Sequence, residues 1–451
     1  MSFPRYSKYK DSGVEWLGEV PEHWEKRSLQ SVASTEDSIF IDGDWIESKD
    51  ISDLGVRYLT SGNVGAGFYK EQGQGFITAA TFEALNCTEV LPGDILISRL
   101  NLPIGRACIV PDLESRIVTC VDNVIFRPGP LFDRRFIVYL LSSKHHFANT
   151  DNLGRGSTMQ RISRSILGKI RFAFPPLPEQ TAIAAFLDRE TAKIDGLVAE
   201  QRRLMELLKE KRQAVISHAV TKGLNPDAPM KPSGIEWLGN VPEHWEVVQS
   251  RRLFRVRNEP ARESDQQLTA SQKYGMLPQS EFMEREGRKV VLIIEGKDSL
   301  RHAEPNDFII SLRSFQGGIE WCTLAGSVTF HYVVLMPIKH VHPPFFAHLF
   351  KSTAYIQALR STANLIRDGQ DLRFSHFVQV DLPIVPLDEQ AAIADFLNQE
   401  LAKLDTLTAE AQRAIDLLQE RRTALISAAV TGQIDVRHIS APQNPCDTDT
   451  K

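Results

Sequence analysis

Two long segments of the chain space their apolar residues as in a helix that packs along one stripe. Alternating steps of four and three residues connect the first stripe at 183, 187, 190, 194, 197, 201, 204, 208, 211, 215 and 218. The same steps connect the second stripe at 393, 397, 400, 404, 407, 411, 414, 418, 421, 425 and 428. This period predicts two coiled-coil helices of about five heptads, each roughly 60 Å long. Gly223 and Gly432 are the expected C-caps.

Charged residues interrupt the two stripes at matching places. Glu190 corresponds to Glu400, and Lys211 corresponds to Arg421. Two unrelated core helices are the alternative interpretation, but unrelated helices have no reason to share their interruptions. We therefore expect the two helices to pack against each other.

Two short phrases that flank the variable parts of the chain occur twice. The phrase SGVEWLGEVPEHWE at 12–25 returns as SGIEWLGNVPEHWE at 233–246, and PLPEQ at 176–180 returns as PLDEQ at 386–390. The repeats divide the chain into a first variable domain at 1–175, a helix at 176–223, a linker with the second variable domain at 224–385, a helix at 386–432 and a tail at 433–451 that we expect to be flexible. The predicted fold class is α+β, with two similar mixed α/β domains, two long helices and an internal repeat.

The pattern within the variable domains is typical of mixed α and β structure. Residues 57–69 predict two short strands around a glycine-rich turn. Further strands are expected at 94–98, 107–110, 290–294 and 308–311, and helices at 132–147 and 345–359. PGDILIS at 92–98 aligns with PNDFIIS at 305–311, so we expect one fold with two different surfaces.

Size and composition restrict the class of protein. A chain of 451 residues is long enough for two to four domains. Its five cysteines are odd in number and show no CxxC spacing, which favours a reduced cytoplasmic setting without a zinc site. No apolar run reaches the roughly 20 residues that span a bilayer, and the N-terminus lacks the apolar core of a signal peptide. The net charge of −5 does not indicate nucleic-acid binding, although local patches decide phosphate contact.

A search for catalytic motifs finds little. The P-loop, the dinucleotide-binding glycine motif, the amino-methyltransferase tetrapeptide and the nucleophile elbow are absent. The triplet EGK at 295–297 superficially fits a metal-dependent nuclease, but no clear partner aspartate precedes it. His145 and His146 are expected at the surface rather than in a metal site. The chain therefore has the character of a binding protein.

Arginine residues cluster within the variable domains. One cluster surrounds GRGSTMQ at 154–160, a corresponding one surrounds DGQ at 368–370, and another lies at 251–262. Arginine docks phosphates or reads guanine with two hydrogen bonds, and glutamine reads adenine. Solvated surface charge is the alternative for each single arginine, but clusters beside glycine- and glutamine-bearing loops in both domains favour a nucleic-acid surface.

The ordered set of repeats carries a resemblance to a known family. Its features are the two SGxEWLGxVPEHWE phrases, the two PLPEQ or PLDEQ helix starts, and the helix ends AVTKG at 219–223 and AVTG at 429–432. Together they resemble the specificity subunit of type I restriction-modification enzymes, the HsdS family, over nearly the whole chain. Asp388 stands where Pro178 stands in the first helix start, and we expect only a local effect there.

The resemblance implies a DNA-recognition subunit without catalytic activity or cofactor of its own. Each variable domain would read one half of a split, asymmetric site in double-stranded DNA, and antiparallel helices would fix the spacing of the halves. The implied partners are two adenine-N6 methyltransferase subunits and ATP-dependent restriction subunits, with no membrane. Those subunits would bind S-adenosylmethionine, ATP and Mg²⁺, in the cytoplasm of a bacterium or archaeon.

Ten residues are the candidates for DNA contact within this scheme. They are Arg99, Arg155, Gln160, Arg161 and Arg164 in the first domain and Arg313, Gln316, Arg367, Gln370 and Arg373 in the second. The phrases around Trp16 and Trp237 are expected to brace each domain against the helices rather than touch bases. Two other functions stay open: a self-contained restriction enzyme that uses EGK at 295–297, and a coiled-coil scaffold that binds only proteins.

Overall fold

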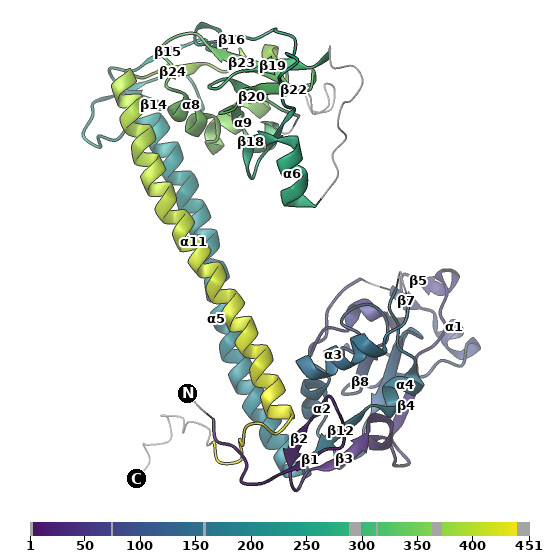
Figure 1. Ribbon diagram of the computed structural model, residues 1–451. Helices are drawn as coiled ribbons and strands as arrows, with labels where there is room; N and C mark the ends of the chain where they lie inside the picture. Colours follow the sequence, from purple (N-terminus) through teal and green to yellow (C-terminus); the bar gives the residue numbers. More distant parts are fainter. Residues whose placement is uncertain are drawn as a thin grey trace, which may run out of the picture. The chain divides into compact units, whose positions relative to one another are not determined.

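The structure, a computed structural model, describes residues 3–73, 75–156, 159–287, 299–312, 314–362 and 372–439. These residues form two compact units, and each unit includes part of both long helices (Figure 1). Unit 1 comprises the described residues of Met1–Gln201 and Arg413–Lys451, and unit 2 comprises those of Arg202–Gln412. Each long helix is divided between the two units, whereas the sequence predicted each helix as a separate segment of the chain.

The variable domain of unit 1 holds two four-stranded sheets. One has the order β4-β11-β8-β9 and is antiparallel, and the other has the order β10-β6-β7-β5 with a parallel β10–β6 pair. The strands are β1 (Tyr9–Asp11), β2 (Glu19–Pro21), β3 (Glu25–Ser28), β4 (Ile39–Asp42), β5 (Ile51–Ser52), β6 (Val56–Leu59), β7 (Gly75–Ile77), β8 (Ile95–Ser98), β9 (Ala107–Ile109), β10 (Ile117–Thr119), β11 (Asn123–Arg127) and β12 (Arg171–Phe174). The helices are α1 (Ala79–Ala84), α2 (Arg134–Leu140), α3 (Lys144–Leu153) and α4 (Arg164–Lys169).

The variable domain of unit 2 repeats much of this layout. Its sheet β16-β23-β20-β21 has the same antiparallel pairing as β4-β11-β8-β9, which supports the expectation of one shared fold. The strands are β13 (Met230–Pro232), β14 (Asn240–Pro242), β15 (Glu246–Val248), β16 (Phe254–Val256), β17 (Leu268–Ser271), β18 (Gly275–Pro278), β19 (Arg301–Ala303), β20 (Phe308–Ile310), β21 (Glu320–Trp321), β22 (Gly326–Val328), β23 (Val333–Pro337) and β24 (Leu382–Ile384). The helices are α6 (Gln279–Glu286), α7 (Ser314–Gly317), α8 (Pro343–Phe350), α9 (Thr353–Ser361) and α10 (Phe374–Phe377).

Two sequence predictions for these domains are wrong in detail. The first strand expected within 57–69 is present as β6, but it pairs with β10 and β7, and the glycine-rich turn is closed by an isolated antiparallel bridge between Val64 and Tyr69. The helices expected at 132–147 and 345–359 are each interrupted by a serine. Ser143 and Ser352 act as N-caps, so each expected helix ends and a second one begins there.

The two predicted long helices are present as α5 (Leu177–Lys222) and α11 (Leu387–Val430). In unit 1, Ile183 near the start of α5 shares a core with Ile426 near the end of α11. In unit 2, Ile216 near the end of α5 shares a core with residues from the start of α11. The helices therefore run antiparallel within each unit.

The seam of the helix pair departs from the predicted steps by one residue. Thr191 and Val198 are buried, whereas the predicted Leu197 is 52% exposed. In α11, Leu401 is buried and the predicted Leu407 is 46% exposed. Both seams begin with two successive steps of four residues, because their first turns pack against a globular core. A helix there keeps about 3.6 residues per turn and drifts from the strict heptad period.

Two ion pairs join the helices at equivalent places. Arg422 Nε lies 3.1 Å from a carboxylate oxygen of Asp195 in unit 1, and Arg212 pairs with Asp405 in unit 2. Asp405 stands in α11 where Asp195 stands in α5, and the same holds for the two arginines. Both pairs are partly exposed, so each contributes about 0–1 kcal/mol and serves chiefly to fix the register.

A glutamate at the start of α5 holds the phrase that precedes the first variable domain. Glu179 is 7% exposed and accepts hydrogen bonds from Trp24 Nε1 at 3.0 Å and from the Tyr6 hydroxyl at 2.8 Å. Its second oxygen lies 2.7 Å from His23 Nε2. A buried carboxylate needs such donors, so the phrase is bound to the helix start.

The equivalent glutamate of α11 repeats this arrangement in unit 2. Glu389 accepts a hydrogen bond from Trp245 Nε1 at 3.1 Å and lies 2.7 Å from His244 Nε2. The glutamine that follows each glutamate also binds the variable domain. Gln180 accepts from a backbone N–H at the start of α2, and Gln390 accepts from one at the start of α8. These bonds confirm that the repeated phrases brace each domain against the helices.

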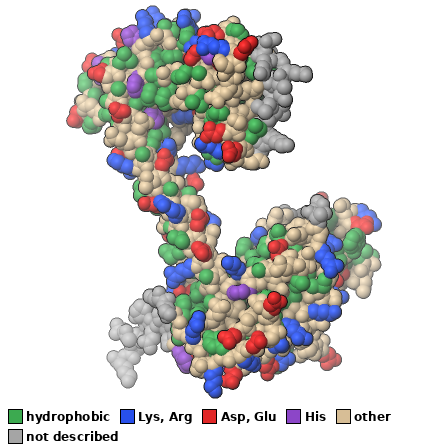
Figure 2. Space-filling model, in the orientation of Figure 1, with side chains coloured by type: hydrophobic (Ala, Val, Ile, Leu, Met, Phe, Trp, Pro, Cys, Tyr) green, Lys and Arg blue, Asp and Glu red, His purple; other side chains and the backbone are tan. Residues whose placement is uncertain are grey.

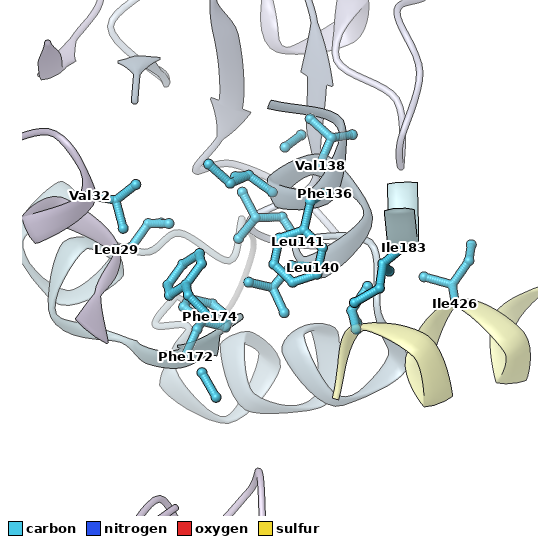
Figure 3. Close-up of a cluster of buried hydrophobic side chains, with 14 of the residues drawn as sticks. Leu29, Val32, Phe136, Val138, Leu140, Leu141, Phe172, Phe174, Ile183 and Ile426 are labelled. Atoms are coloured by element: carbon cyan, nitrogen blue, oxygen red, sulfur yellow. The ribbon is translucent and has the colours of Figure 1, made fainter. Parts of the chain in front are cut away.

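Apolar contacts complete the attachment of the first variable domain. Figure 3 shows Phe136 of α2, Phe174 of β12, Ile183 of α5 and Ile426 of α11, which belong to one buried cluster. Burying one such side chain stabilises a fold by about 1.5–3 kcal/mol. The apolar cluster supplies most of the attachment energy, and the bonds of Glu179 fix the orientation.

Replacing Glu179 with alanine should destabilise unit 1 by about 2–4 kcal/mol, because it leaves the buried donors of Trp24 and Tyr6 without an acceptor. Urea denaturation followed by tryptophan fluorescence measures this loss. Glu389→Ala is the matched control, and its cost should be smaller because the Glu389 side chain is 26% exposed. A loss in the control that equals or exceeds the loss in Glu179→Ala would contradict this ranking.

Candidate nucleic-acid interface

A carboxylate before one central strand anchors the sheet of each variable domain. Asp94 precedes β8 and accepts two hydrogen bonds of 2.7 Å from Arg127. Asp307 precedes β20 and accepts bonds of 2.7 and 3.1 Å from Arg257. Arg127 ends β11 whereas Arg257 follows β16, so equivalent carboxylates are neutralised from different strands. The aligned stretches PGDILIS and PNDFIIS indicate that Asp94 and Asp307 correspond. The sequence does not indicate which arginine neutralises each of them.

Backbone hydrogen bonds bring three candidates of the first domain, Arg155, Gln160 and Arg161, together on one surface. Leu100 and Arg155 each form a β-bridge with Arg161. The backbone N–H of Asn101 donates to the Gln160 carbonyl at 3.1 Å. The loop after β8 and the stretch before α4 therefore form one continuous patch.

A buried arginine that the sequence analysis did not single out holds the loops beneath this patch. Arg106 is 9% exposed, and its guanidinium donates to the carbonyls of Val64 at 2.7 Å, Ser61 at 2.9 Å, Asn101 at 2.8 Å and Leu100 at 3.0 Å. Arginine carries five N–H donors, so one side chain satisfies several loop carbonyls. Burial lowers the pKa of Arg106.

Arg99 belongs to the same internal scaffold. It is 9% exposed, and its Nε lies 3.2 Å from the Asp42 carboxylate. Its guanidinium also donates to the carbonyls of Val121 and Ile162. These bonds engage Arg99 within the protein, which fits a positioning role better than the direct DNA contact expected from the sequence.

Arg161 and Arg164 are exposed, and each is paired with a carboxylate. The Arg161 side chain is 51% exposed and donates to Asp122. The Arg164 side chain is 43% exposed and donates to Asp42 at 3.0 Å and to a backbone carbonyl at 2.9 Å. Asp42 therefore serves both Arg164 and Arg99, and sequence spacing gave no signal for either aspartate.

Arg155 and Gln160 complete the patch. Arg155 is exposed, and its side chain has no ion-pair or hydrogen-bond partner among the residues that the structure describes. Gln160 is half-buried, and its Oε1 atom is buried without a hydrogen-bond partner in the described part of the chain. The predicted DNA contacts of both residues stay predictions.

Two of the five candidates of the second domain can be placed. Gln316 on α7 and Arg373 at the N-cap of α10 are both exposed. Arg313, Arg367 and Gln370 lie outside the described residues. Their DNA contacts stay predictions, as does any correspondence with the patch of unit 1.

The arginine cluster at 251–262 contains side chains of two kinds. Two of them form ion pairs with carboxylates. Arg257 pairs with Asp307, and Arg262 pairs with Glu304 at 2.9 Å. Arg252 and Arg255 are exposed and have no ion-pair partner within the described part of the chain. Figure 2 shows Lys and Arg side chains gathered on unit 2 in the region of β15 and β16. No carboxylate of the described residues therefore offsets the charges of Arg252 and Arg255.

The two adjacent histidines were expected at the surface, and this is wrong for His146. Its side chain is fully buried, and Nε2 lies 3.1 Å from the Gly105 carbonyl. Burial lowers the pKa of His146 to about 4. Gly105 has a φ of +80°, and a Cβ there would lie 2.7 Å from the His146 ring, so this close approach requires glycine. The contact packs the loop after β8 onto α3.

His302 lies in a buried cluster of charges in unit 2. Its side chain is 1% exposed, with Nδ1 2.8 Å from Asp265 and Nε2 2.8 Å from Glu304. Two carboxylate acceptors require both ring nitrogens to donate, so the ring is protonated and offers no lone pair for a metal or for a general base. No group of three His, Cys, Asp or Glu side chains in the described ranges could hold a metal ion. The strand expected at 290–294 and the EGK triplet lie outside those ranges.

Comparison with known proteins finds a similarity to specificity subunits of type I restriction enzymes. The family described as "Type I restriction modification DNA specificity domain" matches residues 21–203. The putative type I restriction enzyme MjaX specificity subunit of Methanocaldococcus jannaschii is 21% identical, over 93% of this chain and 96% of its own length. The EcoBI specificity subunit of Escherichia coli is 21% identical, over 96% of this chain and 91% of its own length. The family match and both relatives indicate an HsdS specificity subunit.

Solved structures share the fold of this chain. A chain from the structure described as the basis of complex assembly and conformational transition of the type I R-M system aligns with a TM-score of 0.64 at 13% identity, covering 91% of this chain and 98% of that chain. The HsdS subunit from Thermoanaerobacter tengcongensis aligns with a TM-score of 0.50 at 13% identity, covering 94% of this chain and all of that one. Within the described ranges, no helix has the length and apolar character needed to cross a membrane.

The His302 cluster predicts a pH-dependent stability of unit 2. Burial lowers the pKa of His302, but the hydrogen bonds that its ring donates to Glu304 and Asp265 outweigh burial and raise the pKa above its ordinary value. A raised pKa stabilises the fold fully below the ordinary histidine pKa of about 6.5, and this stability is lost as the pH rises through the raised value. Thermal unfolding of the wild-type chain across neutral and alkaline pH measures the loss, which should be smaller in His302→Gln. Equal pH dependence of both proteins would contradict the assignment.

Proposed function

We propose that this chain is the non-catalytic recognition subunit of a type I restriction-modification complex and that it reads a bipartite, asymmetric DNA site. The observation that carries the proposal is the repeated frame around two inserts of unlike sequence. Glu179 and Glu389 hold the two variable domains in the same way, whereas the amino-acid sequences between the repeated phrases differ almost completely. Two similar domains with different surfaces suit two unlike half-sites.

The two long helices would connect the readers of the two half-sites. Because each helix contributes to both units, a change in helix length would alter the spacing between the half-sites. Adenine-N6 methylation and ATP-dependent restriction would be carried out by partner subunits, which would bind S-adenosylmethionine, ATP and Mg²⁺. A methyltransferase that acts on a base within a duplex extrudes that base into its own active site, so the recognition subunit needs no catalytic group.

Exposed leucines on the helices are the proposed contacts of the methyltransferase subunits. Leu197 and Leu417 are 52% and 66% exposed in unit 1, and Leu207 and Leu407 are 53% and 46% exposed in unit 2. Leu407 and Leu417 stand in α11 where Leu197 and Leu207 stand in α5. This repetition suits two copies of one partner that bind to equivalent surfaces.

Mapping of methylated adenines across a genome tests the proposed function. Cells that express the methyltransferase subunits should methylate one bipartite sequence only when this chain is also present. An unchanged map would favour the scaffold that binds only proteins. Incubation of the purified chain with DNA and Mg²⁺ is the second arm, and cleavage by this polypeptide alone would instead establish the self-contained restriction enzyme.

Leu207→Glu should weaken assembly with the methyltransferase subunit by about 10-fold, because a charge enters an apolar interface. Size-exclusion chromatography and titration calorimetry measure the assembly. Leu54→Glu is the control, since Leu54 is 80% exposed on the first variable domain and should tolerate the change. Equal effects of the two substitutions would exclude Leu207 from the interface.

A further inference from the structure

We propose that Asp122 and Arg161 together read a guanine in the half-site of unit 1, with Asp122 as a positioning residue that determines specificity. This inference rests on the proposed function and adds a base and a pair of residues to it. Its starting point is that Arg161 is half-exposed yet donates to the Asp122 carboxylate.

The backbone beneath the Arg161 side chain is fixed on both sides. Arg161 and Arg155 exchange backbone hydrogen bonds of 2.9 and 3.0 Å, and Leu100 forms a bridge on the other side. The neighbouring Ile162 N–H donates to the Arg99 carbonyl at 3.0 Å. The arginine therefore projects from a small sheet-like base rather than from a free loop.

The position of Asp122 is fixed by the same scaffold. It lies in the turn between β10 and β11, and its carbonyl accepts from the Arg99 N–H at 2.8 Å. The Arg99 guanidinium donates to the carbonyls of Val121 in this turn and of Ile162 beside Arg161. Arg99 thus ties together the two backbone segments that carry the pair. Arg99, which the sequence predicted to contact DNA, thereby positions Asp122 and Arg161.

The pair has the chemistry that a guanine edge requires. A guanidinium is a planar fork, and Asp122 engages one of its terminal nitrogens. The remaining N–H groups suit the two acceptors, O6 and N7, that guanine presents in the major groove. The carboxylate also cancels the charge of Arg161, which weakens its attraction to phosphates that carry no sequence information. A side chain that is held in advance loses less conformational freedom when it binds.

The neighbouring arginines do not meet these conditions. Arg164 donates through Nε to Asp42 and through a further nitrogen to the Phe40 carbonyl, so fewer of its N–H groups remain. Arg155 is exposed and has no carboxylate partner among the described residues. Arg155 therefore suits a phosphate, and it provides a matched control on the same pair of backbone segments.

Methylation rates of the assembled complex on oligonucleotide duplexes test the proposal. Each position of the site is substituted in turn, with wild-type chain, Asp122→Asn, Arg161→Ala and Arg155→Ala. We expect Asp122→Asn and Arg161→Ala to relax one guanine position of one half-site by about 10-fold or more and to leave the other half-site unchanged. Arg155→Ala should weaken binding to the same extent at every sequence. It should also reduce the slope of the logarithm of the binding constant against the logarithm of the salt concentration by about 0.9 per lost phosphate contact.

Arg161→Lys is the second variant, because it keeps the charge and loses the planar fork. It should relax the same guanine position while it retains the salt dependence of the wild-type complex. Unchanged base preference in Asp122→Asn, or a uniform loss like that of Arg155→Ala, would overturn the proposal. If the wild-type complex methylates no specific site, the proposed function itself fails, and this outcome is distinct from either result.

Discussion

A carboxylate at the first turn of each long helix, buried in Glu179 and partly exposed in Glu389, is the constraint on which the rest of the structure depends. Glu179 and Glu389 accept the indole N–H of Trp24 and Trp245. A carboxylate in such a place is stable only while its donors surround it. The phrase that precedes each variable domain is thereby bound to a helix start, and the strands that follow the phrase begin from a fixed point. Each domain consequently has one orientation on its helices.

This constraint leaves the rest of each domain free to differ. The Asp94 and Asp307 carboxylates are equivalent, yet Arg127 and Arg257 reach them from different strands. The physical requirement is that a buried charge be neutralised, and either strand can supply the cation. A fold held in this way tolerates replacement of its loops, because the loops contribute little to the attachment of the domain. Such tolerance suits a protein whose two halves present different surfaces.

Ion pairs also explain why the net charge of the chain is a poor guide to the local charge of its arginine-bearing surfaces. Arg161 and Arg164 lie on a surface where Asp122 and Asp42 neutralise them, so a cluster of arginines in the sequence is not a strongly positive patch in the fold. Arg155 has no such partner among the described residues. Paired arginines are held in place and suit recognition of bases, and unpaired ones suit phosphates. A net charge of −5 is compatible with both.

The sequence by itself determined the helices, the repeated frame and the correspondence of the two domains, because periodicity and repeated phrases are local features of the chain. It placed Arg161 and Gln160 on one loop, but it could not find Asp122 or Asp42, which come from distant strands. The strict heptad seam, the strand pairing expected within 57–69 and the exposed His146 were wrong for the same reason. Contacts with the globular core decided the seam, the pairing of β6 and the burial of His146. Only the tertiary structure brings such segments together, since ion pairs and buried side chains depend on distance in space rather than along the chain.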